Sequence, residues 1–285
     1  MKVLVLGVTG MLGNAMFRYL TADSGLEVYG SARDEKARRY YPDTPRERLI
    51  TGVDVENHDS LVRIMGSVRP NVVINCIGLI KQLSAAKDPL AAITINALLP
   101  HRLAHLCKAA DARLIHISTD CVFSGTKGLY LESDHSDAED LYGKSKFLGE
   151  VAYQNAVTLR TSIIGHELGG SAHALLCWFL SQEGATDGYT RAIFSGLPTV
   201  ELAKVIGTFV IPRPELNGLY HVAAEPIAKY DLLRQIAEIY GKEINIRPVE
   251  DPSIDRSLDA TRFREKTGYV APTWRKLIER MHKFQ

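Results

Sequence analysis

The chain has 285 residues, 46% of them hydrophobic and 24% charged, and a formal net charge of +1. This length allows one large α/β domain, or a domain with a smaller appendage, around a sizeable core. A net charge so close to zero gives no electrostatic case for a partner such as nucleic acid or a membrane surface, and the composition is typical of a soluble globular protein.

The cysteines and the apolar runs indicate a cytoplasmic protein. The four cysteines lie far apart with no C-x-x-C, which argues against a zinc site or a disulfide framework: Cys76, Cys107, Cys121 and Cys177. We expect them to be buried, reduced thiols. The nine histidines are scattered, and no metal site is predicted. The first apolar run, residues 3–6, is too short for a signal peptide, and no stretch approaches the roughly 18 apolar residues of a membrane span.

Short apolar runs alternate with amphipathic stretches through the first 165 residues. The runs are nearly continuous in apolar residues, as strands buried on both faces should be: KVLVLG, LEVYGSA, RLITGV, NVVINCIG, RLIHIST and AVTLRTSII. Helical periodicity separates them, for example over residues 11–20 and 61–68. Strand followed by helix, repeated, predicts right-handed βαβ units and an α/β fold with a Rossmann-type, doubly wound parallel sheet.

The rhythm changes after residue 165. Helices are predicted within residues 171–183, 196–211, 228–241 and 273–284, and strands within 217–223 and 244–250. The apolar face of the last helix predicts packing rather than membrane binding: Trp274, Leu277, Ile278 and Met281. We therefore expect a Rossmann-type domain over residues 1–165 and a smaller α/β part over residues 166–285, with a strand and helix near 195–225 that return to the first domain.

A glycine-rich turn follows the first strand. The segment VLVLGVTGMLG places Gly7, Gly10 and Gly13 between that strand and the first helix. Glycines here allow a tight turn, close approach of a pyrophosphate, and close helix packing, while the helix N-terminus offers free N–H groups to phosphates. The spacing alone is weak, but its position predicts a dinucleotide site rather than an empty strand-to-helix turn.

The end of the second strand bears on which dinucleotide binds. NAD-binding units usually carry an acid there for the ribose 2′-hydroxyl, whereas NADP needs a basic or hydroxyl residue for the 2′-phosphate. In YGSARD, Ser31 and Arg33 precede the first acid, Asp34. This order favours NADP(H), with NAD(H) as the second choice, unless Arg33 is only a solvated side chain. After the third strand, Asp54 either contacts the adenine amino group or caps a turn.

The segment DLYGKSKFLGE places Tyr142 and Lys146 four residues apart on a predicted helix. This spacing puts both side chains on one helical face, where an ammonium near a phenol would favour the phenolate and lower the pKa of the phenol. The pair alone decides nothing, because a Y-x-x-x-K occurs by chance in roughly half of chains of this length.

Further motifs occur in order and carry a family resemblance. NCIG (residues 75–78) ends the fourth strand, STDCVFSG (118–125) ends the fifth, and YGKSK (142–146) begins the next helix; LRTS, SGLPTVELAKVI and DRSLD follow. With the glycine turn, these segments resemble the extended short-chain dehydrogenase/reductase family, and within it the dTDP-4-dehydrorhamnose reductases and related nucleotide-sugar reductases. The resemblance covers most of the chain and is strongest over residues 1–165.

The resemblance implies roles for individual residues. Thr119 would hydrogen-bond the substrate carbonyl, Tyr142 would donate the proton, and Lys146 would contact the nicotinamide ribose. The implied cofactor-binding residues are Gly7, Thr9, Gly10, Met11, Leu12, Gly13, Ser31, Arg33, Asp54, Val55, Cys76, Ile77, Gly78, Tyr142 and Lys146. Substrate candidates are Asp120 and Ser162, from the STDCVFSG and LRTS segments, with Lys81 and Gln82 beside the sugar and Arg191 for a diphosphate. Arg191 is otherwise a solvated loop residue.

The resemblance implies an NADP-binding domain over residues 1–165 and a mainly substrate-binding part over residues 166–285. It also implies NADPH-dependent reduction of a keto group on a nucleotide-linked deoxy-sugar, as in the synthesis of cell-surface polysaccharides. A homodimer is a candidate assembly, but the sequence leaves the oligomeric state open. An epimerase or dehydratase on the same scaffold is the alternative, and a non-catalytic NADP-binding regulatory subunit is the second. The segment NCIGLIKQL and the long stretch 34–50 depart from rhamnose-type reductases. The sugar, its nucleotide and the stereochemistry of reduction therefore stay open.

Overall fold

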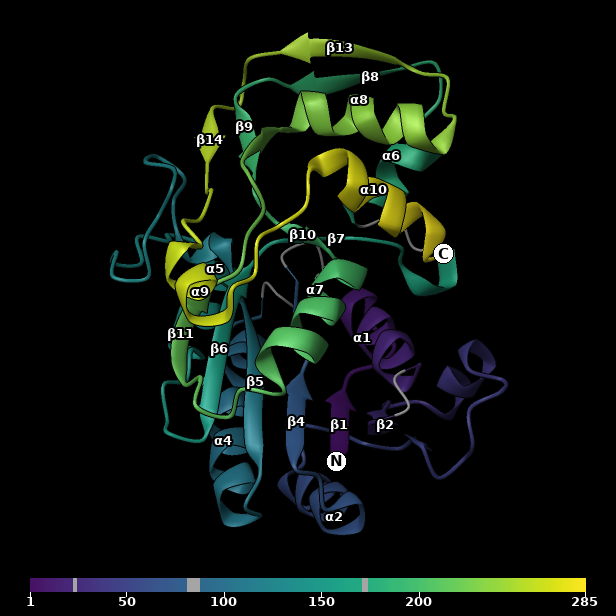
Figure 1. The fold of residues 1–285 in the computed structure, drawn as a ribbon, viewed down its shortest axis with the longest axis vertical. Helices are drawn as coiled ribbons and strands as arrows, with labels where there is room; N and C mark the ends of the chain where they lie inside the picture. Colours follow the sequence, from purple (N-terminus) through teal and green to yellow (C-terminus); the bar gives the residue numbers. More distant parts are fainter. Residues whose placement is uncertain (23–24, 81–87, 171–173) are drawn as a thin grey trace.

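The computed structural model describes residues 1–22, 25–80, 88–170 and 174–285. Its centre is a sheet of seven strands in the order β11-β6-β5-β4-β1-β2-β3, with every neighbouring pair parallel (Figure 1). The strands are β1 (Lys2–Leu6), β2 (Glu27–Ser31), β3 (Leu49–Ile50), β4 (Val72–Asn75), β5 (Arg113–Thr119), β6 (Ala156–Thr161) and β11 (Gly218–His221). The predicted doubly wound parallel sheet is confirmed. Its strand order reverses between β1 and β4, the point at which such sheets bind ligands.

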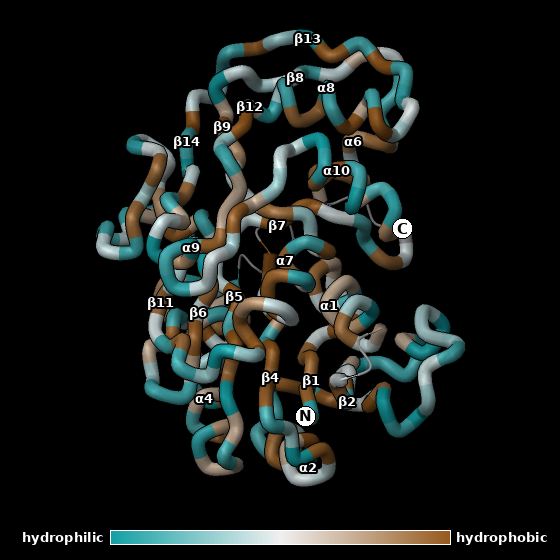
Figure 2. The backbone as a smooth tube through the Cα atoms, in the orientation of Figure 1, coloured by the Kyte–Doolittle hydropathy of each residue, from teal (hydrophilic) through white to brown (hydrophobic). Residues whose placement is uncertain are grey.

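Helices cover both faces of this sheet. One face packs against α1 (Met11–Thr21) and α7 (Thr199–Val205), and the other against α2 (His58–Val68) and α4 (Leu99–Ala109). Alternate residues of β1 enter the two cores, with Val3 and Val5 on one side and Leu4 and Leu6 on the other. The continuous apolar runs arise from this two-sided burial, and Figure 2 shows the central strands as hydrophobic segments.

Shorter helices and helical turns connect these layers. A continuous helical stretch leads into α4 through α3 (Pro89–Ala92) and the π-helical η3 (Ile93–Leu98), and α5 (Leu141–Leu148) follows β5. The other short turns are η1 (Glu35–Tyr40), η4 (Asp120–Val122), η5 (Leu168–Gly170) and η6 (Ile206–Val210).

A smaller lobe lies above the carboxyl edge of the sheet (Figure 1). Within the described ranges it contains three small sheets, β10-β7, β12-β9-β14 and β13-β8. Their strands are β7 (Ile163–Ile164), β8 (Ala185–Tyr189), β9 (Ala192–Phe194), β10 (Leu197–Pro198), β12 (Ile227–Ala228), β13 (Asn245–Val249) and β14 (Ile254–Asp255). The helices are α6 (Leu175–Ser181), α8 (Lys229–Tyr240), α9 (Thr261–Thr267) and α10 (Trp274–Lys283).

The second half of the chain is interleaved with the first. Strand β11 pairs with β6 at the edge of the large sheet, and α7 packs against α1. The division at residue 165 therefore stays a prediction about organisation, since the later segment contributes to both lobes. The apolar face of α10 is buried, as expected from its periodicity: Trp274, Leu277, Ile278 and Met281.

The cysteines correct one expectation. All four are free, but only Cys107 is fully buried, whereas Cys76, Cys121 and Cys177 are partly exposed. Two of these three, Cys76 and Cys121, follow the ends of β4 and β5, where the sheet opens toward the smaller lobe. Within the part of the chain that the structure describes, no helix has both the length and the apolar character needed to span a membrane.

Candidate active site

The glycine turn brings α1 into contact with the end of β1. Gly7 has a φ of +83°, a conformation that favours glycine, and its N–H donates to the Ser31 carbonyl at 3.2 Å. A Cβ on Gly13 would lie 2.1 Å from the Gly7 oxygen, so only glycine permits this approach of the helix. The turn therefore has the geometry that close contact with a pyrophosphate requires.

The N-terminus of α1 is open to a ligand. Its N-cap is Gly10, which provides no side-chain hydrogen bond to the first backbone N–H groups. Thr9 and Gly10 are exposed, and Met11 is half-buried. Leu12 is only 6% exposed and enters the core, so its backbone is the part available to a phosphate.

The two residues predicted to bind the 2′-phosphate lie at the end of β2 and differ in their exposure. Ser31 is 1% exposed, and its Oγ accepts the Gly7 N–H at 3.3 Å, which makes it part of the support beneath the turn. Arg33 is exposed, and within the described residues no partner binds its guanidinium. Of the two, Arg33 is thus the residue available to an added phosphate.

Asp54 caps a turn. Its carboxylate accepts the Glu56 N–H at 3.0 Å, and its own N–H donates to Ser60 Oγ at 3.1 Å. Of the two interpretations left open by the sequence, the turn cap is the one with contacts in the structure. Both Asp54 and the half-buried Val55 lie after β3, and their contact with adenine stays a prediction.

The long stretch between β2 and β3 supports the glycine turn, which sequence reasoning did not anticipate. Tyr41 is 7% exposed, and its hydroxyl donates to the Val8 carbonyl at 2.6 Å and lies 3.0 Å from Asn14 Oδ1. Burial raises the pKa of this phenol, so it stays a neutral donor. No local pattern distinguishes Tyr41 from the neighbouring Tyr40 in the sequence.

The end of β4 lies beside the glycine turn. The Ile77 side chain packs over Gly7, so closely that a Cβ there would meet it at 2.7 Å, while Gly78 is exposed. Cys76 is partly exposed, and burial raises the pKa of its thiol to about 12, so it is a neutral group. Lys81 and Gln82 lie outside the described residues.

Asn96 in η3 is a site residue that the sequence did not reveal. Its Oδ1 accepts the Leu79 N–H at 2.9 Å, and its Nδ2 donates to the Leu79 carbonyl at 3.2 Å and to Ser145 Oγ at 3.2 Å. This one amide thereby joins the loop after β4 to helix α5. Its partners are 17 and 49 residues away, which is why no local pattern identified it.

Thr119 ends β5 and begins η4. Its Oγ1 donates to Asp120 Oδ1 at 3.1 Å and accepts the Cys121 N–H at 3.1 Å. Asp120 is 9% exposed, and burial raises the pKa of its carboxyl, although the charge of Arg256 opposes this. Arg256, from the DRSLD segment, donates through Nε to the Phe123 carbonyl at 2.7 Å and is a cation that sequence reasoning missed.

Helix α5 brings Tyr142 to the same place. A Cβ on Gly143 would lie 2.3 Å from the Cys121 carbonyl, so glycine lets the helix pack directly against η4. Burial raises the pKa of the half-buried Tyr142 phenol, the nearby Cys121 raises it further, and a hydrogen bond with Thr119 partly opposes this. The sequence predicted a lowered pKa from Lys146. The structure differs because that lysine is directed elsewhere.

Lys146 is 5% exposed and donates from Nζ to the Ile117 carbonyl at 2.7 Å. Burial lowers its pKa to about 8, and the charge of Glu150 opposes this shift. A Cβ on Gly78 would lie 3.9 Å from Nζ, so the ammonium faces the end of β4. Thr119, Tyr142 and Lys146 therefore meet at the carboxyl edge of the sheet, on the side of the glycine turn.

The remaining substrate candidates lie on the smaller lobe. Ser162 is half-buried, and its carbonyl accepts the Leu197 N–H at 2.9 Å. Arg191 is exposed at the start of β9, where its backbone carbonyl binds the N–H of Ile254. No described side chain pairs with the Arg191 guanidinium, which leaves it available to an anion but does not join it to Thr119.

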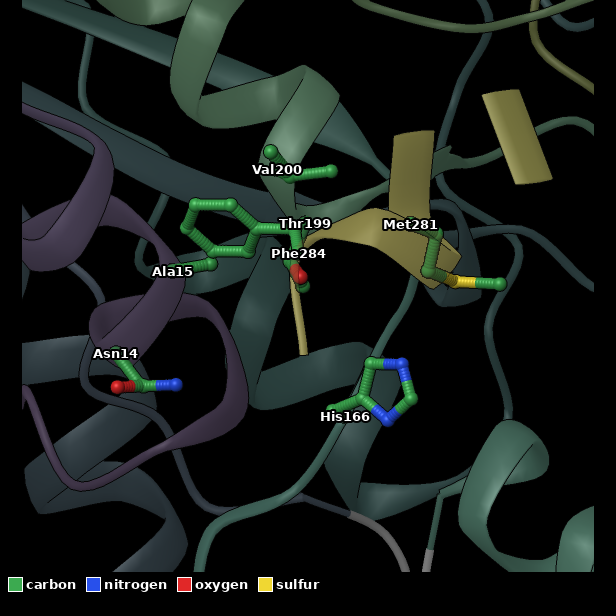
Figure 3. Close-up of a pocket in the computed structure, with 7 residues that line it drawn as sticks. All are labelled: Asn14, Ala15, His166, Thr199, Val200, Met281 and Phe284. Carbon is green, nitrogen blue, oxygen red and sulfur yellow. The ribbon is translucent and has the colours of Figure 1, made fainter. Parts of the chain in front are cut away.

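A separate small cavity of about 10 Å³ lies between α1, α7 and α10 (Figure 3). In the close-up, Asn14 and His166 face the same space beside Phe284, and the His166 ring also binds the Tyr240 hydroxyl at 2.9 Å. A space of this size holds about one water molecule. It is therefore a small gap between the packed elements α1, α7 and α10, and it is too small for a cofactor.

Two histidines on α4 have a spacing that can suit a metal ion, which the prediction of no metal site did not take into account. His101 and His105 are four residues apart, but both rings pack around Tyr153, and His101 also contacts the Leu148 carbonyl at 2.8 Å. Within the described ranges, no group of three or more His, Cys, Asp or Glu residues could hold a metal ion. In this structure the pair serves packing.

Comparison with known families and proteins matches one family over the chain and finds relatives named as reductases and as a methionine adenosyltransferase subunit. The family model described as RmlD substrate binding domain matches residues 1–284. The probable low-salt glycan biosynthesis reductase Agl14 of Haloferax volcanii is 28% identical, covering 96% of this chain and 94% of that protein. The dTDP-4-dehydrorhamnose reductase of Aggregatibacter actinomycetemcomitans is 22% identical over 99% of both. Methionine adenosyltransferase 2 subunit beta of Xenopus tropicalis is 25% identical, covering 89% of this chain and 76% of that protein.

Solved structures have the same fold. A dTDP-4-dehydrorhamnose reductase from Clostridium acetobutylicum superposes with a TM-score of 0.80 at 22% identity, covering 99% of both chains. One from Bacillus anthracis, solved in complex with NADP, gives a TM-score of 0.78 at 19% identity, covering 100% of this chain and 99% of that one.

Proposed function

Since the chain belongs to the RmlD substrate binding domain family, we propose that it is an NADPH-dependent oxidoreductase that reduces a keto group of a nucleotide-linked sugar. The observation that carries this proposal is the meeting of Thr119, Tyr142 and Lys146 at the sheet edge, beside the uncapped N-terminus of α1. The names of the glycan biosynthesis reductase and the dehydrorhamnose reductase support the substrate class. The substrate is then a dTDP-, UDP- or GDP-linked deoxy-sugar of cell-surface polysaccharide synthesis.

The residues around the glycine turn suit an NADP cofactor. Gly7 and Gly13 let a pyrophosphate approach the backbone, and the free N–H groups of α1 carry the positive end of the helix dipole. The Arg33 guanidinium, which has no partner among the described residues, would bind the 2′-phosphate, and Asp54 and Val55 would contact the adenine. NAD(H) is the second choice, because it lacks the phosphate that Arg33 would bind.

Bound NADPH would supply the hydride, and the protein's own residues manage the proton. Burial keeps Tyr142 a neutral phenol near pH 7, which is the form that a proton donor needs. As negative charge develops on the substrate oxygen, Tyr142 protonates it. Thr119 stabilises the same oxygen through its hydroxyl, a contact that matters most when the charge is largest.

The rim of the smaller lobe offers cations for the substrate's diphosphate. The Arg191 guanidinium has no partner among the described side chains, and the Arg256 guanidinium uses only Nε, in its bond to the Phe123 carbonyl. A guanidinium matches the paired oxygens of a diphosphate. We assign the substrate, on this basis, to the space between the sheet edge, which carries Asp120, and the smaller lobe, which carries Ser162.

A non-catalytic regulatory subunit is the second candidate, because one group of relatives is named as a methionine adenosyltransferase subunit. Such a chain would bind NADP and change a partner enzyme's activity without turnover. The presence of buried Thr119 and Lys146 side chains beside the half-buried Tyr142 favours the reductase. An epimerase or dehydratase would recycle its cofactor instead of consuming it.

We also propose that the protein is a cytoplasmic homodimer. Large apolar side chains are exposed on the neighbouring segments α3, η3 and α5: Leu90, Ile93, Leu98, Phe147 and Leu148. A surface of this kind is typical of a protein interface. Light scattering should give twice the 31.6 kDa chain mass, and Leu148→Glu should reduce it to one chain; a monomeric parent protein would contradict the dimer. The free thiols suit a reducing compartment.

A cofactor-oxidation assay tests the proposed function. Purified protein is mixed with NADPH or NADH and a panel of dTDP-, UDP- and GDP-linked 4-keto sugars, and nicotinamide absorbance is followed. We expect NADPH to be consumed with at least one sugar, in equal amount to the hydroxyl product. Product without loss of absorbance would indicate an epimerase or dehydratase. Absence of turnover, with stimulation of a co-purified enzyme, would support the regulatory subunit.

A further inference from the structure

Glu150 follows α5 and forms a buried ion pair beside the proposed proton-transfer site. Its side chain is 9% exposed, and its two oxygens accept Arg160 Nε and Nη2, each at 2.6 Å. The Ser118 hydroxyl donates to the same carboxylate at 2.7 Å. Arg160 itself is 2% exposed. Three charge-assisted bonds therefore fix this carboxylate in one orientation.

Arg160 is held equally firmly on its far side. Its Nη1 lies 3.2 Å from His221 Nε2, and its guanidinium lies 5.1 Å from the centre of the Phe123 ring. Burial lowers the pKa of His221 to about 3, so that ring is neutral and does not compete for the carboxylate. The arginine thus approaches Glu150 from β6.

Glu150 and Lys146 are anchored at neighbouring positions on β5. The two residues are four positions apart, and they bind consecutive residues of β5, with Lys146 on the Ile117 carbonyl and Glu150 on Ser118. Burial lowers the pKa of Lys146, and the negative charge of Glu150 is the opposing influence. A lysine buried to this degree needs an anion to stay charged near neutral pH.

The other groups around Lys146 do not provide that anion. His116 on β5 is fully buried, and burial holds its pKa well below its ordinary value, so it is neutral. Asn96 from η3 reaches this region as an uncharged amide, bound to Ser145. Tyr142 lies on α5 itself and keeps its proton, because burial raises its pKa. Among the described residues, Glu150 is the carboxylate that acts on the lysine.

We propose that Glu150 is a positioning residue for the proposed reduction: held by Arg160 and Ser118, its carboxylate keeps the buried Lys146 side chain charged and directed toward the nicotinamide ribose. The catalytic role of Glu150 in this inference rests on the proposed function. The coupling between Glu150 and Lys146 can be tested without that function, because it also determines how NADPH binding depends on pH.

The test measures NADPH affinity by fluorescence, and turnover where a keto-sugar substrate is found, between about pH 6 and pH 10. Glu150→Gln keeps the shape of the side chain and removes its charge. Glu201→Gln is the matched control, because Glu201 is 1% exposed and pairs with Arg280 at 2.5 Å, yet lies in α7 and does not act on Lys146. Glu150→Asp restores the charge.

In the parent protein, both quantities should fall as pH rises through about 8, where Lys146 loses its proton. In Glu150→Gln this alkaline fall should move to lower pH. If the shift reaches one unit, the loss between pH 6 and pH 8 should be about tenfold, against about twofold in the parent. Glu150→Asp should return the midpoint toward the parent value, and Glu201→Gln should leave it unchanged. Introducing Glu150→Gln into Lys146→Met should add no pH dependence.

An alkaline midpoint that is the same in Glu150→Gln, Glu201→Gln and the parent would overturn the proposal. If Glu150→Gln does not fold, the double variant Glu150→Gln, Arg160→Gln removes both charges of the buried pair and is measured in the same way. If no keto-sugar is reduced, the proposed function fails, while the pH dependence of NADPH affinity still decides the Glu150 proposal. Absence of NADPH binding at every pH would overturn both.

Discussion

Replacing Gly13 with alanine tests whether the glycine turn is built for a dinucleotide. The added Cβ would lie 2.1 Å from the Gly7 carbonyl oxygen and 2.7 Å from its carbon, whereas ordinary contacts begin at 3.4 Å. Helix α1 must therefore retreat by about 1.3 Å at its first turn, away from the strand end. Overpacking of this kind costs about 1–3 kcal/mol. The N–H groups proposed to bind the pyrophosphate move with the helix.

Gly13→Ala should weaken NADPH binding by about tenfold or more, because each 1.4 kcal/mol corresponds to about a factor of ten. The melting temperature should fall by about 2–4 °C for each kcal/mol lost. Fluorescence titration and thermal unfolding measure the two effects. Gly66→Ala is the control: it lies within α2 with no atom within 4 Å of the added carbon, so it should leave NADPH binding unchanged and stabilise the helix slightly. Parent-like NADPH affinity in Gly13→Ala would refute the assignment of this turn.

The other predictions concern the cofactor phosphate, the proton donor and pH. Arg33→Ala should weaken NADPH by about 10- to 100-fold and NADH little, since the exposed guanidinium has no other described partner; equal loss for both would remove its 2′-phosphate role. Tyr142→Phe should keep NADPH affinity within a few-fold while turnover falls by about 10²–10⁴, and near-normal turnover would exclude it as the acid. The pKa of Lys146 is lowered from 10.5 to about 8, so the lysine is charged below that pH and loses its charge above it. The pH–rate profile should therefore fall as the pH rises through about 8. A profile that stays flat to about pH 9.5 would contradict this.

The large sheet could be predicted because its strands are buried on both faces. Every residue of β5 is buried, and the run RLIHIST shows this directly as a strand. The strand predicted within residues 244–250 is β13, but its partner β8 was not predicted, since the exposed and polar residues of β8 leave no apolar run. The two strands pair across about 60 residues. No local sequence pattern indicates this pairing, because the two strands are far apart in the chain.

In the candidate site, the positions of the main residues could be predicted, but their long-range contacts could not. Thr119, Tyr142 and Lys146 occur in short motifs at strand and helix ends, so their positions follow from the βαβ order. The direction of the Tyr142 pKa shift did not follow, because it depends on how deeply α5 packs against η4, which Gly143 permits. Glu150 stands in the same motif as Tyr142, yet its partners Ser118 and Arg160 come from β5 and β6. Its importance is visible only once those strands are adjacent.

The most direct measurement of the central claim is hydride transfer itself. The protein is supplied with NADPH carrying deuterium at the nicotinamide C4 position and with a reducible nucleotide-linked keto-sugar, and the product is analysed by mass spectrometry and NMR. Our account predicts one deuterium on the carbon that becomes the hydroxyl carbon, in equal amount to the NADPH consumed, and loss of this transfer in Tyr142→Phe. Conversion of the sugar without deuterium incorporation, or with NADPH fully retained, would contradict it.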